Sequence, residues 1–139
     1  MLRTMLSWLP RRKLCLVADD SAAIREAARS ILKELHFHTA EAENGLDVLA
    51  QCRRSRPDAI LLDHSMPHLD GMGVMEALRL YQDGPPPKII FCTADRDPRH
   101  IARAIGAGAH EYLIKPFDRA ILTAKFEQLG LTNLNAGRS

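Results

Sequence analysis

The sequence has few cysteines and no long apolar run. These two features argue against a disulfide-rich secreted protein and against a membrane-spanning protein. Cys15, Cys52 and Cys92 are an odd number of cysteines at long spacings. The first and the last lie within apolar runs, which indicates buried free thiols in a reducing compartment. No apolar stretch approaches membrane-spanning length. The N-terminus also lacks the long apolar centre and small-residue cleavage site of a secretory signal. We therefore expect a cytoplasmic protein that does not insert into membranes.

The chain also lacks an excess of charge of one sign, an internal repeat and a low-complexity segment. Its formal net charge of +2 at pH 7 is too small to indicate nucleic acid as the main partner, so we expect no DNA binding. The 139 residues, 46% of them hydrophobic, fit one globular domain. We expect an N-terminal extension over residues 1–12, one domain over 13–131 and a flexible polar tail over 132–139.

Short apolar runs alternate with stretches of helical periodicity along the domain. The runs predict strands at residues 14–18, 37–42, 59–62, 88–92 and 110–114. The periodic stretches predict helices at residues 24–35, 46–52, 72–81, 101–105 and 121–129. Ser21 is the expected cap of the first helix, and Asp118 opens the last. A helix between successive strands makes each connection a crossover, which favours parallel pairing. The sequence therefore predicts a doubly wound α/β fold, a five-stranded parallel sheet with five helices.

Polar side chains follow four of the predicted strands. They are Asp19 and Asp20 after the first strand, Asp63 after the third, Thr93 after the fourth and Lys115 after the fifth. Each alone has an ordinary explanation, such as a turn, a helix cap, strand propensity or a solvated lysine. In parallel α/β sheets, however, ligands bind beyond the carboxyl ends of the strands. Because all of these residues are expected at the same edge of the sheet, a functional site is favoured over a separate ordinary explanation for each one.

Three carboxylates at one edge of a sheet require neutralising cations. Two carboxylates about 4 Å apart repel by roughly 4 kcal/mol at an effective dielectric constant of about 20. Lys115 supplies one positive charge, and Mg²⁺, a hard ion that binds oxygen ligands and retains water, suits the remainder. Mg²⁺ and Lys115 would stabilise a transferring phosphoryl group, Asp63 would attack it in line, and Thr93 would donate a hydrogen bond to it. These residues thus predict a magnesium-dependent phosphoryl-transfer site.

Four segments resemble, in order, the motifs of the response-regulator receiver family. They are LVADDSAAIR, DAILLDHSMPHLDG, IIFCTAD and GAHEYLIKPFD, and the resemblance runs from Lys13 to about Leu131. It implies a flavodoxin-like fold with strand order 2-1-3-4-5 and a place in a two-component phosphorelay. It also implies that Asp63 accepts a phosphoryl group from the phosphohistidine of a histidine kinase. Such a domain assists its own phosphorylation and dephosphorylation, and is not an enzyme that turns over an external substrate.

The resemblance further implies which residues bind the metal and which set the lifetime of the phosphoryl group. Asp20, Asp63 and the backbone carbonyl of Ser65 are expected to bind Mg²⁺ directly, and Asp19 is expected to bind it through water. Two positions modulate the lifetime of the phosphoryl group in this family, the second after the phosphoacceptor and the second after the threonine. In this chain they are Ser65 and Asp95.

A switch pair is the other implied feature. Thr93 is expected to move toward the phosphoryl group, and Tyr112 is expected to turn inward into the vacated space. The peptide bond between Lys115 and Pro116 is expected to be cis, a form that X–Pro bonds adopt at low cost. His64 stands beside the site in sequence and is expected to be a bystander rather than an acid or a base.

We expect the signal to leave through the surface of the domain itself, because no DNA-binding or enzymatic segment follows the last predicted helix. In this family the output surface is most often formed by the fourth helix, the fifth strand and the fifth helix. The segments IIFCTAD, GAHEYLIKPFD and AKFEQLGL most resemble stand-alone chemotaxis regulators of the CheY kind, which implies a downstream target such as a flagellar motor switch component. A shuttle that passes phosphate to a histidine phosphotransfer protein would share this core. Phosphorylation-dependent dimerisation is also left open.

Three other hypotheses are weighed against these. Arg96, Arg99 and Arg103 have helical spacing; a solvated face is the simpler interpretation, and binding of a cyclic dinucleotide or an acidic partner is the sharper one. Phosphohydrolases that form an aspartyl phosphate usually carry a second Asp two residues after the nucleophile, where this chain has Ser65. An unphosphorylated scaffold is disfavoured because the set of site residues is intact.

Overall fold

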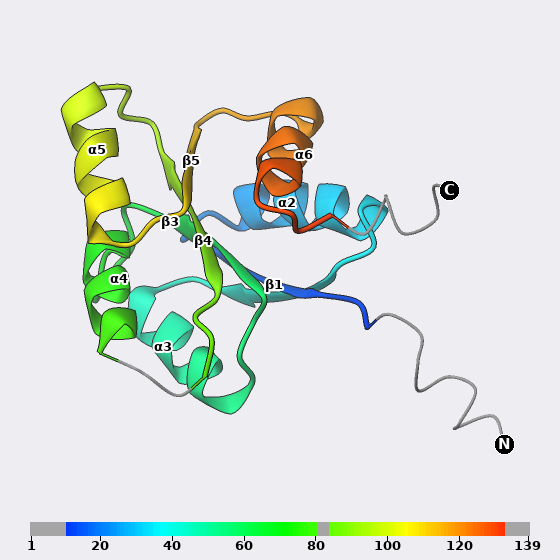
Figure 1. Cartoon of the computed structure of the whole chain (residues 1–139), viewed down its shortest axis with the longest axis horizontal. Coiled ribbons are helices and arrows are strands. Elements are labelled where there is room, and N and C mark those ends of the chain that lie inside the picture. Colours follow the sequence, from blue (N-terminus) through cyan, green and yellow to red (C-terminus); the bar gives the residue numbers. More distant parts are fainter. Residues whose placement is uncertain (1–10, 81–83, 133–139) are drawn as a thin grey trace, which may run out of the picture.

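A five-stranded parallel sheet forms the middle layer of the domain, with helices on both of its faces (Figure 1). The computed structural model describes residues 11–80 and 84–132. The strands are β1 (Leu14–Ala18), β2 (His38–Ala42), β3 (Ala59–Asp63), β4 (Lys88–Thr93) and β5 (Glu111–Ile114). Their order in the sheet is β2-β1-β3-β4-β5 and every pairing is parallel. The predicted topology and strand order are confirmed.

The described residues contain five helices, which lie on the two faces of the sheet. They are α2 (Ala22–Glu34), α3 (Gly45–Arg54), α4 (Gly71–Arg79), α5 (Pro98–Ala107) and α6 (Arg119–Gln128). Helices α2 and α6 cover one face, while α3, α4 and α5 cover the other (Figure 1). Each helix begins after a residue whose side chain accepts a backbone N–H; these are Ser21, Asn44, Asp70, Asp97 and Asp118. The predicted roles of Ser21 and Asp118 are confirmed. None of these helices is long and apolar enough to cross a membrane.

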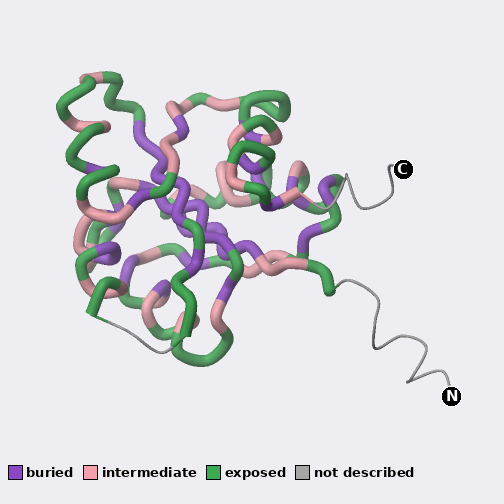
Figure 2. The backbone as a smooth tube through the Cα atoms, viewed as in Figure 1, coloured by how far each residue is buried: buried purple, intermediate pink, exposed green. Residues whose placement is uncertain are grey.

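Strand residues alternate between two apolar cores, one on each face of the sheet. In β1, Cys15 and Val17 belong to the core under α2 and α6, whereas Leu16 and Ala18 belong to the core under α3, α4 and α5. Every residue of the central strand β3 is buried, while the edge strand β2 is largely exposed or half-buried (Figure 2). The buried thiols predicted at Cys15 and Cys92 are confirmed, and both cysteines are free.

The observed ends of β3, β4 and α4 differ from the predicted ones by one or two residues. Strands β3 and β4 extend to Asp63 and Thr93, because Asp63 stays in register with Cys92 of the neighbouring strand. Helix α4 ends at Arg79, two residues earlier than predicted. Its C-cap Leu80 is 84% exposed and so adds no buried apolar surface that would extend the helix. The predicted extension (except residues 11 and 12), Tyr81 and all but the first residue of the predicted tail lie outside the described residues.

Candidate functional site

Three carboxylates meet at the carboxyl edge of the sheet, where the sequence places them. Asp19 directly follows β1 and Asp63 is the last residue of β3; they are only 3% and 5% exposed. Asp20 is exposed at the mouth of this cluster. One carboxylate oxygen from each of the three residues lies within 4.8 Å of the others. The ladder fixes this arrangement, because β1 and β3 are neighbouring parallel strands that end side by side.

Lys115 brings the opposite charge from the end of β5. Its Nζ donates to Asp19 Oδ2 at 2.6 Å and to Asp63 Oδ1 at 2.8 Å. The lysine side chain is 18% exposed, so this double ion pair is largely shielded from water. The backbone N–H of Lys115 also donates to the carbonyl of Thr93, which anchors the lysine to the end of β4. The structure therefore brings together the predicted acids and the predicted ammonium. The Lys115–Pro116 peptide bond is cis, as predicted.

The pKa values of Asp63 and Lys115 reflect both burial and the charges that surround them. Burial raises the pKa of Asp63, the hydrogen bond from Lys115 opposes that effect, and repulsion by Asp19 and Asp20 adds to it. The net result is a raised pKa for the Asp63 carboxyl group. Burial acts to lower the pKa of Lys115, but its hydrogen bonds and attraction to Asp19 and Asp63 outweigh burial, so the pKa of the ammonium is raised. The lysine stays charged, and the carboxylates still lack a full counter-charge.

The donor set of this cluster fits a hard divalent cation. It consists of carboxylate oxygens, the ligands that Mg²⁺ prefers, with one carboxylate open to solvent so that water can complete the coordination. Ser65 lies in the exposed loop between β3 and α4, two residues after Asp63. A backbone carbonyl at this position would add another oxygen donor.

Thr93 is buried at the end of β4, and its hydroxyl has two neighbours. The backbone N–H of Asp95 donates to Thr93 Oγ1 at 3.1 Å. The Nε2 atom of His100, in the first turn of α5, lies 3.2 Å from the same oxygen. Asp95 itself is an exposed residue of the loop, and its Oδ1 accepts the N–H of Asp97. The sequence predicted Thr93 and Asp95 in this region but did not predict His100.

Tyr112 occupies a half-buried position in β5, opposite Phe91 of β4. The Nζ atom of Lys125, on α6, lies 4.2 Å from the centre of the tyrosine ring, at cation–π distance. The same ammonium pairs with the Glu111 carboxylate at 3.2 Å. The aromatic ring therefore lies at the junction of β5 and α6, where a change of its rotamer would alter the surface of both elements.

The prediction that three arginines share one helix is wrong for Arg96. Helix α5 starts at Pro98 and its N-cap is Asp97, so Arg96 lies in the preceding loop. Arg99 pairs with the cap residue itself, with its Nη2 atom 2.9 Å from Asp97 Oδ2. The Asp–Pro pair is a helix-start signal, and it explains why the helix begins later than the arginine spacing indicated. Arg99 and Arg103 are four residues apart on α5, but Arg96 is not on that helix, so the premise of three arginines along one helix face is lost.

Gly71 packs against β3, the strand that ends in Asp63, and a substitution at this position tests that packing. A Cβ atom at Gly71 would lie 2.5 Å from the carbonyl oxygen of Asp63 and 3.0 Å from Phe91 Cε1. We expect Gly71→Ala to lower the free energy of unfolding by about 1–3 kcal/mol through overpacking. Gly106→Ala is the matched control, because nothing lies within 4 Å of its Cβ position on α5. It should raise stability by about 0.5–1 kcal/mol. Urea unfolding of both variants measures this, and equal effects would contradict it.

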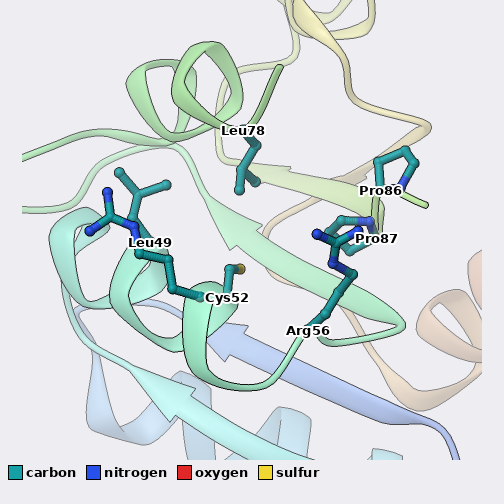
Figure 3. A pocket seen from close by; sticks show the side chains of 7 residues that line it. Leu49, Cys52, Arg56, Leu78, Pro86 and Pro87 are labelled. Atoms are coloured by element: carbon teal, nitrogen blue, oxygen red, sulfur yellow. The ribbon is translucent and has the colours of Figure 1, made fainter. Parts of the chain in front are cut away.

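A small cavity lies away from the carboxylate cluster, and no carboxylate is among the described residues that line it. It lies between α3, α4 and the segment before β4, and Figure 3 shows Leu49, Cys52, Leu78 and Pro87 around it. Its volume is about 30 Å³, which is room for about two water molecules. Burial raises the pKa of Cys52 to about 11, so its thiol is protonated at neutral pH. This cavity therefore lacks the carboxylate and ammonium groups that meet at the sheet edge.

The sequence matches a known family over most of its length. The profile described as "Response regulator receiver domain" matches residues 15–127. The transcriptional regulatory protein PrrA of Mycobacterium bovis is 36% identical over 114 residues, which are 82% of this chain and 48% of that protein. PrrA of Mycobacterium tuberculosis gives the same values. The chain thus spans about half the length of these curated relatives.

Solved structures show the same fold. The chemotaxis response regulator CheY4 of Vibrio cholerae has a TM-score of 0.81 at 25% identity, over 86% of this chain and 99% of that chain. The receiver domain of the sensor histidine kinase PA1611 from Pseudomonas aeruginosa has a TM-score of 0.76 at 27% identity, over 85% and 97% of the two chains. That structure contains a magnesium ion coordinated in its active site cleft. With an acidic cluster and a paired lysine at the same edge of a five-stranded parallel sheet, and a profile match over most of its length, this chain belongs to the response regulator receiver domain family.

Proposed function

We propose that the chain is a phosphoacceptor of a two-component system in which Asp63 receives the phosphoryl group from the phosphohistidine of a histidine kinase. The observation that carries this proposal is the partly buried contact of Lys115 Nζ with both Asp19 and Asp63. In the transfer, the P–N bond of the phosphohistidine breaks as a P–O bond to Asp63 forms, and the released imidazole takes up a proton. Asp63 is held in place for this attack by the β3 ladder.

Each neighbouring residue has a defined part in the proposed transfer. Lys115 remains an ammonium, as its raised pKa supports, and pairs with an oxygen of the phosphoryl group. Asp20, Asp63 and the Ser65 carbonyl would hold Mg²⁺ directly, and Asp19 would hold it through water. When bound, Mg²⁺ supplies the charge that neutralises the equatorial oxygens of the phosphoryl group. Thr93 donates its hydroxyl proton to that group.

The proposed output is a change of the face formed by α5, β5 and α6, driven by Thr93 and Tyr112. Two exposed apolar residues, Ile105 of α5 and Ile121 of α6, are 43% and 44% exposed and offer contact area to a partner. We further propose a chemotaxis-type role in the cytoplasm, with a target such as a flagellar motor switch component. The likeness to CheY4 and the free cysteines support this role and this location.

A second candidate is the receiver module of a transcriptional regulator, which the identity with PrrA favours. A pull-down with and without beryllofluoride distinguishes the two: a motor or phosphotransfer protein captured only in the activated state supports the first candidate. Capture of a DNA-binding segment supports the second. In either case we propose that the chain does not turn over external phosphoesters, because Ser65 stands where hydrolases of this chemistry carry an acid. Steady-state release of phosphate from a small phosphoester would contradict this.

Asp20→Asn tests the metal part of the proposal. Asp20 is exposed, so its replacement leaves the core intact while removing one of the three carboxylates. We expect Mg²⁺ at a hundred times its Kd to stabilise the wild-type chain by about 2.7 kcal/mol. We also expect phosphoryl labelling from acetyl phosphate to require Mg²⁺, and Asp20→Asn to lose most of both responses.

Thermal unfolding in EDTA or in Mg²⁺, together with the labelling assay, measures these effects. Glu43→Gln is the control, because Glu43 is an exposed carboxylate just after β2 and outside the cluster. It should keep both responses. The cluster is not the metal site if Mg²⁺ changes neither the stability nor the labelling of the wild-type chain. The same conclusion follows if Asp20→Asn keeps the full effect of Mg²⁺ on both.

A further inference from the structure

His100 lies against the buried hydroxyl of Thr93 and is itself nearly buried. Its Nε2 atom is 3.2 Å from Thr93 Oγ1, and its side chain is 11% exposed. The imidazole ring packs edge-on against the ring of His64, with centroids 4.6 Å apart, and lies 5.8 Å from the ring of Phe91. The ring therefore has a fixed place between the end of β4 and the residue that follows Asp63.

The neighbours of His100 indicate which of its ring nitrogens carries the proton. Asp95 Oδ2 lies 3.9 Å from Nδ1, and a carboxylate on that side favours the tautomer with the proton on Nδ1. In that tautomer Nε2 is an acceptor. The oxygen of Thr93 already accepts the N–H of Asp95, so the hydroxyl proton of Thr93 is free to point at Nε2. We therefore assign the Thr93 hydroxyl as the donor and His100 Nε2 as the acceptor of their 3.2 Å contact.

A hydroxyl group has one proton to donate. In the proposed function, Thr93 must donate that proton to the phosphoryl group on Asp63. A phosphoryl oxygen carries charge and is therefore the stronger acceptor, but it competes with His100 for the same proton. The contact with His100 thus stabilises the resting position of Thr93 and opposes activation.

We propose that His100 is a positioning residue that holds the Thr93 hydroxyl in its resting orientation and thereby sets the threshold of the switch. This inference rests on the proposed function of Thr93 and Asp63. It also connects the phosphorylation site to the output face, because His100 is part of α5. When Thr93 turns to the phosphoryl group, the first turn of α5 loses a hydrogen bond to the sheet. The acceptor on His100 is then left without its donor, and α5 is less firmly held to β4.

Removal of the acceptor should favour the activated state. His100→Phe keeps an aromatic ring against His64 and Phe91 but has no nitrogen to hold Thr93. We expect it to bind beryllofluoride, in the presence of Mg²⁺, about two- to tenfold more tightly than the wild-type chain does, the factor that one hydrogen bond is worth. His100→Gln, which can place an amide oxygen near the position of Nε2, should return the affinity toward the wild-type value. Calorimetric titration measures the beryllofluoride affinity of the wild-type chain, His100→Phe and His100→Gln.

Repeating the His100→Phe substitution in a Thr93→Val chain tests whether His100 acts through the Thr93 hydroxyl or has only a structural effect. In Thr93→Val there is no hydroxyl to hold, so His100→Phe should leave beryllofluoride affinity unchanged there. The same gain in both backgrounds would overturn the proposal, and so would equal affinities of the wild-type chain and His100→Phe. If the wild-type chain binds no beryllofluoride, both the proposed function and this inference are overturned. If the wild-type chain binds it but replacement of His100 does not change the affinity, only this inference is overturned.

The wild-type chain offers a measurement that does not depend on the folding of a variant. ¹⁵N NMR of the histidine side chains should show His100 as the Nδ1–H tautomer in the resting state. Its Nε2 resonance should shift on addition of beryllofluoride as the hydrogen bond from Thr93 is lost. A resting Nε2–H tautomer, or an Nε2 resonance that does not respond to beryllofluoride, would overturn the proposal.

Discussion

Asp63→Asn reduces phosphoryl labelling, from acetyl phosphate or from a phosphorylated kinase, to background. The amide has almost the shape of the carboxylate but lacks the anionic oxygen that attacks phosphorus. Asp63 is 5% exposed and its backbone is part of the β3 ladder, so an isosteric change preserves the fold around it. Intact-mass measurement or a radiolabelled donor gives the result, with Mg²⁺ present throughout.

Asp58→Asn is the matched control for this variant. Asp58 directly precedes β3, at the end of the strand opposite to Asp63, and its Oδ2 accepts the N–H of Leu14. An asparagine retains a side-chain acceptor at that position, so labelling should remain at the wild-type level. Labelling of Asp63→Asn to the wild-type extent would mean that another residue is the phosphoacceptor. Loss of labelling in both variants would indicate damage to the strand rather than loss of a nucleophile.

The same substitution should change how stability depends on pH when no metal is present. Burial is the main cause of the raised pKa of Asp63, so the ionised carboxylate is less favourable in the folded than in the unfolded chain. The contribution of Asp63 to stability is then fully present below the ordinary value of 3.8 and is lost as the pH rises through the raised folded pKa. Asn does not titrate. The difference in unfolding free energy, Asp63→Asn minus wild type, should therefore grow as the pH rises through that window. Urea unfolding in EDTA measures it, and a pH-independent difference would contradict the raised pKa.

Much of the fold could be predicted from the sequence because the central strands are buried and therefore almost entirely apolar. An apolar run such as residues 59–62 has few alternatives once helices flank it, and the four helical crossovers between successive strands impose parallel pairing. The carboxylate cluster followed for the same reason. Asp19 and Asp63 come at the ends of neighbouring strands, so the sheet alone brings them together without any detail of side-chain packing.

Features that depend on how a helix docks could not be predicted in this way. His100 is seven residues from Thr93, and its ring reaches the hydroxyl only because α5 packs at a particular angle against β4. Sequence spacing does not determine that angle. The start of α5 is different, because Asp97 and Pro98 are a recognisable cap and first turn. Greater weight on that signal than on arginine spacing would have placed Arg96 in the loop.

Lys115→Met lowers the free energy of unfolding of the metal-free chain by about 3–5 kcal/mol, the usual cost of removing one partner from a buried ion pair. The methionine fills a similar volume but leaves Asp19 and Asp63 without the ammonium that contacts both. Repulsion by Asp19 already contributes to the raised pKa of Asp63, after burial, and it would no longer be offset by the ammonium. Urea unfolding in EDTA measures the loss.

Lys125→Met is the control for this second variant, because its side chain is 19% exposed, close to the 18% of Lys115. Lys125 pairs with the single carboxylate of Glu111, so its replacement should cost less. Mg²⁺ should restore more stability to Lys115→Met than it adds to the wild-type chain, since the cation then replaces the missing ammonium between the carboxylates. Equal losses from the two lysines, or an equal gain from Mg²⁺ in Lys115→Met and the wild-type chain, would mean that Lys115 does not neutralise the cluster. Phosphoryl labelling of Lys115→Met should still fall, because the metal cannot also supply the lysine's pairing with the incoming phosphoryl oxygen.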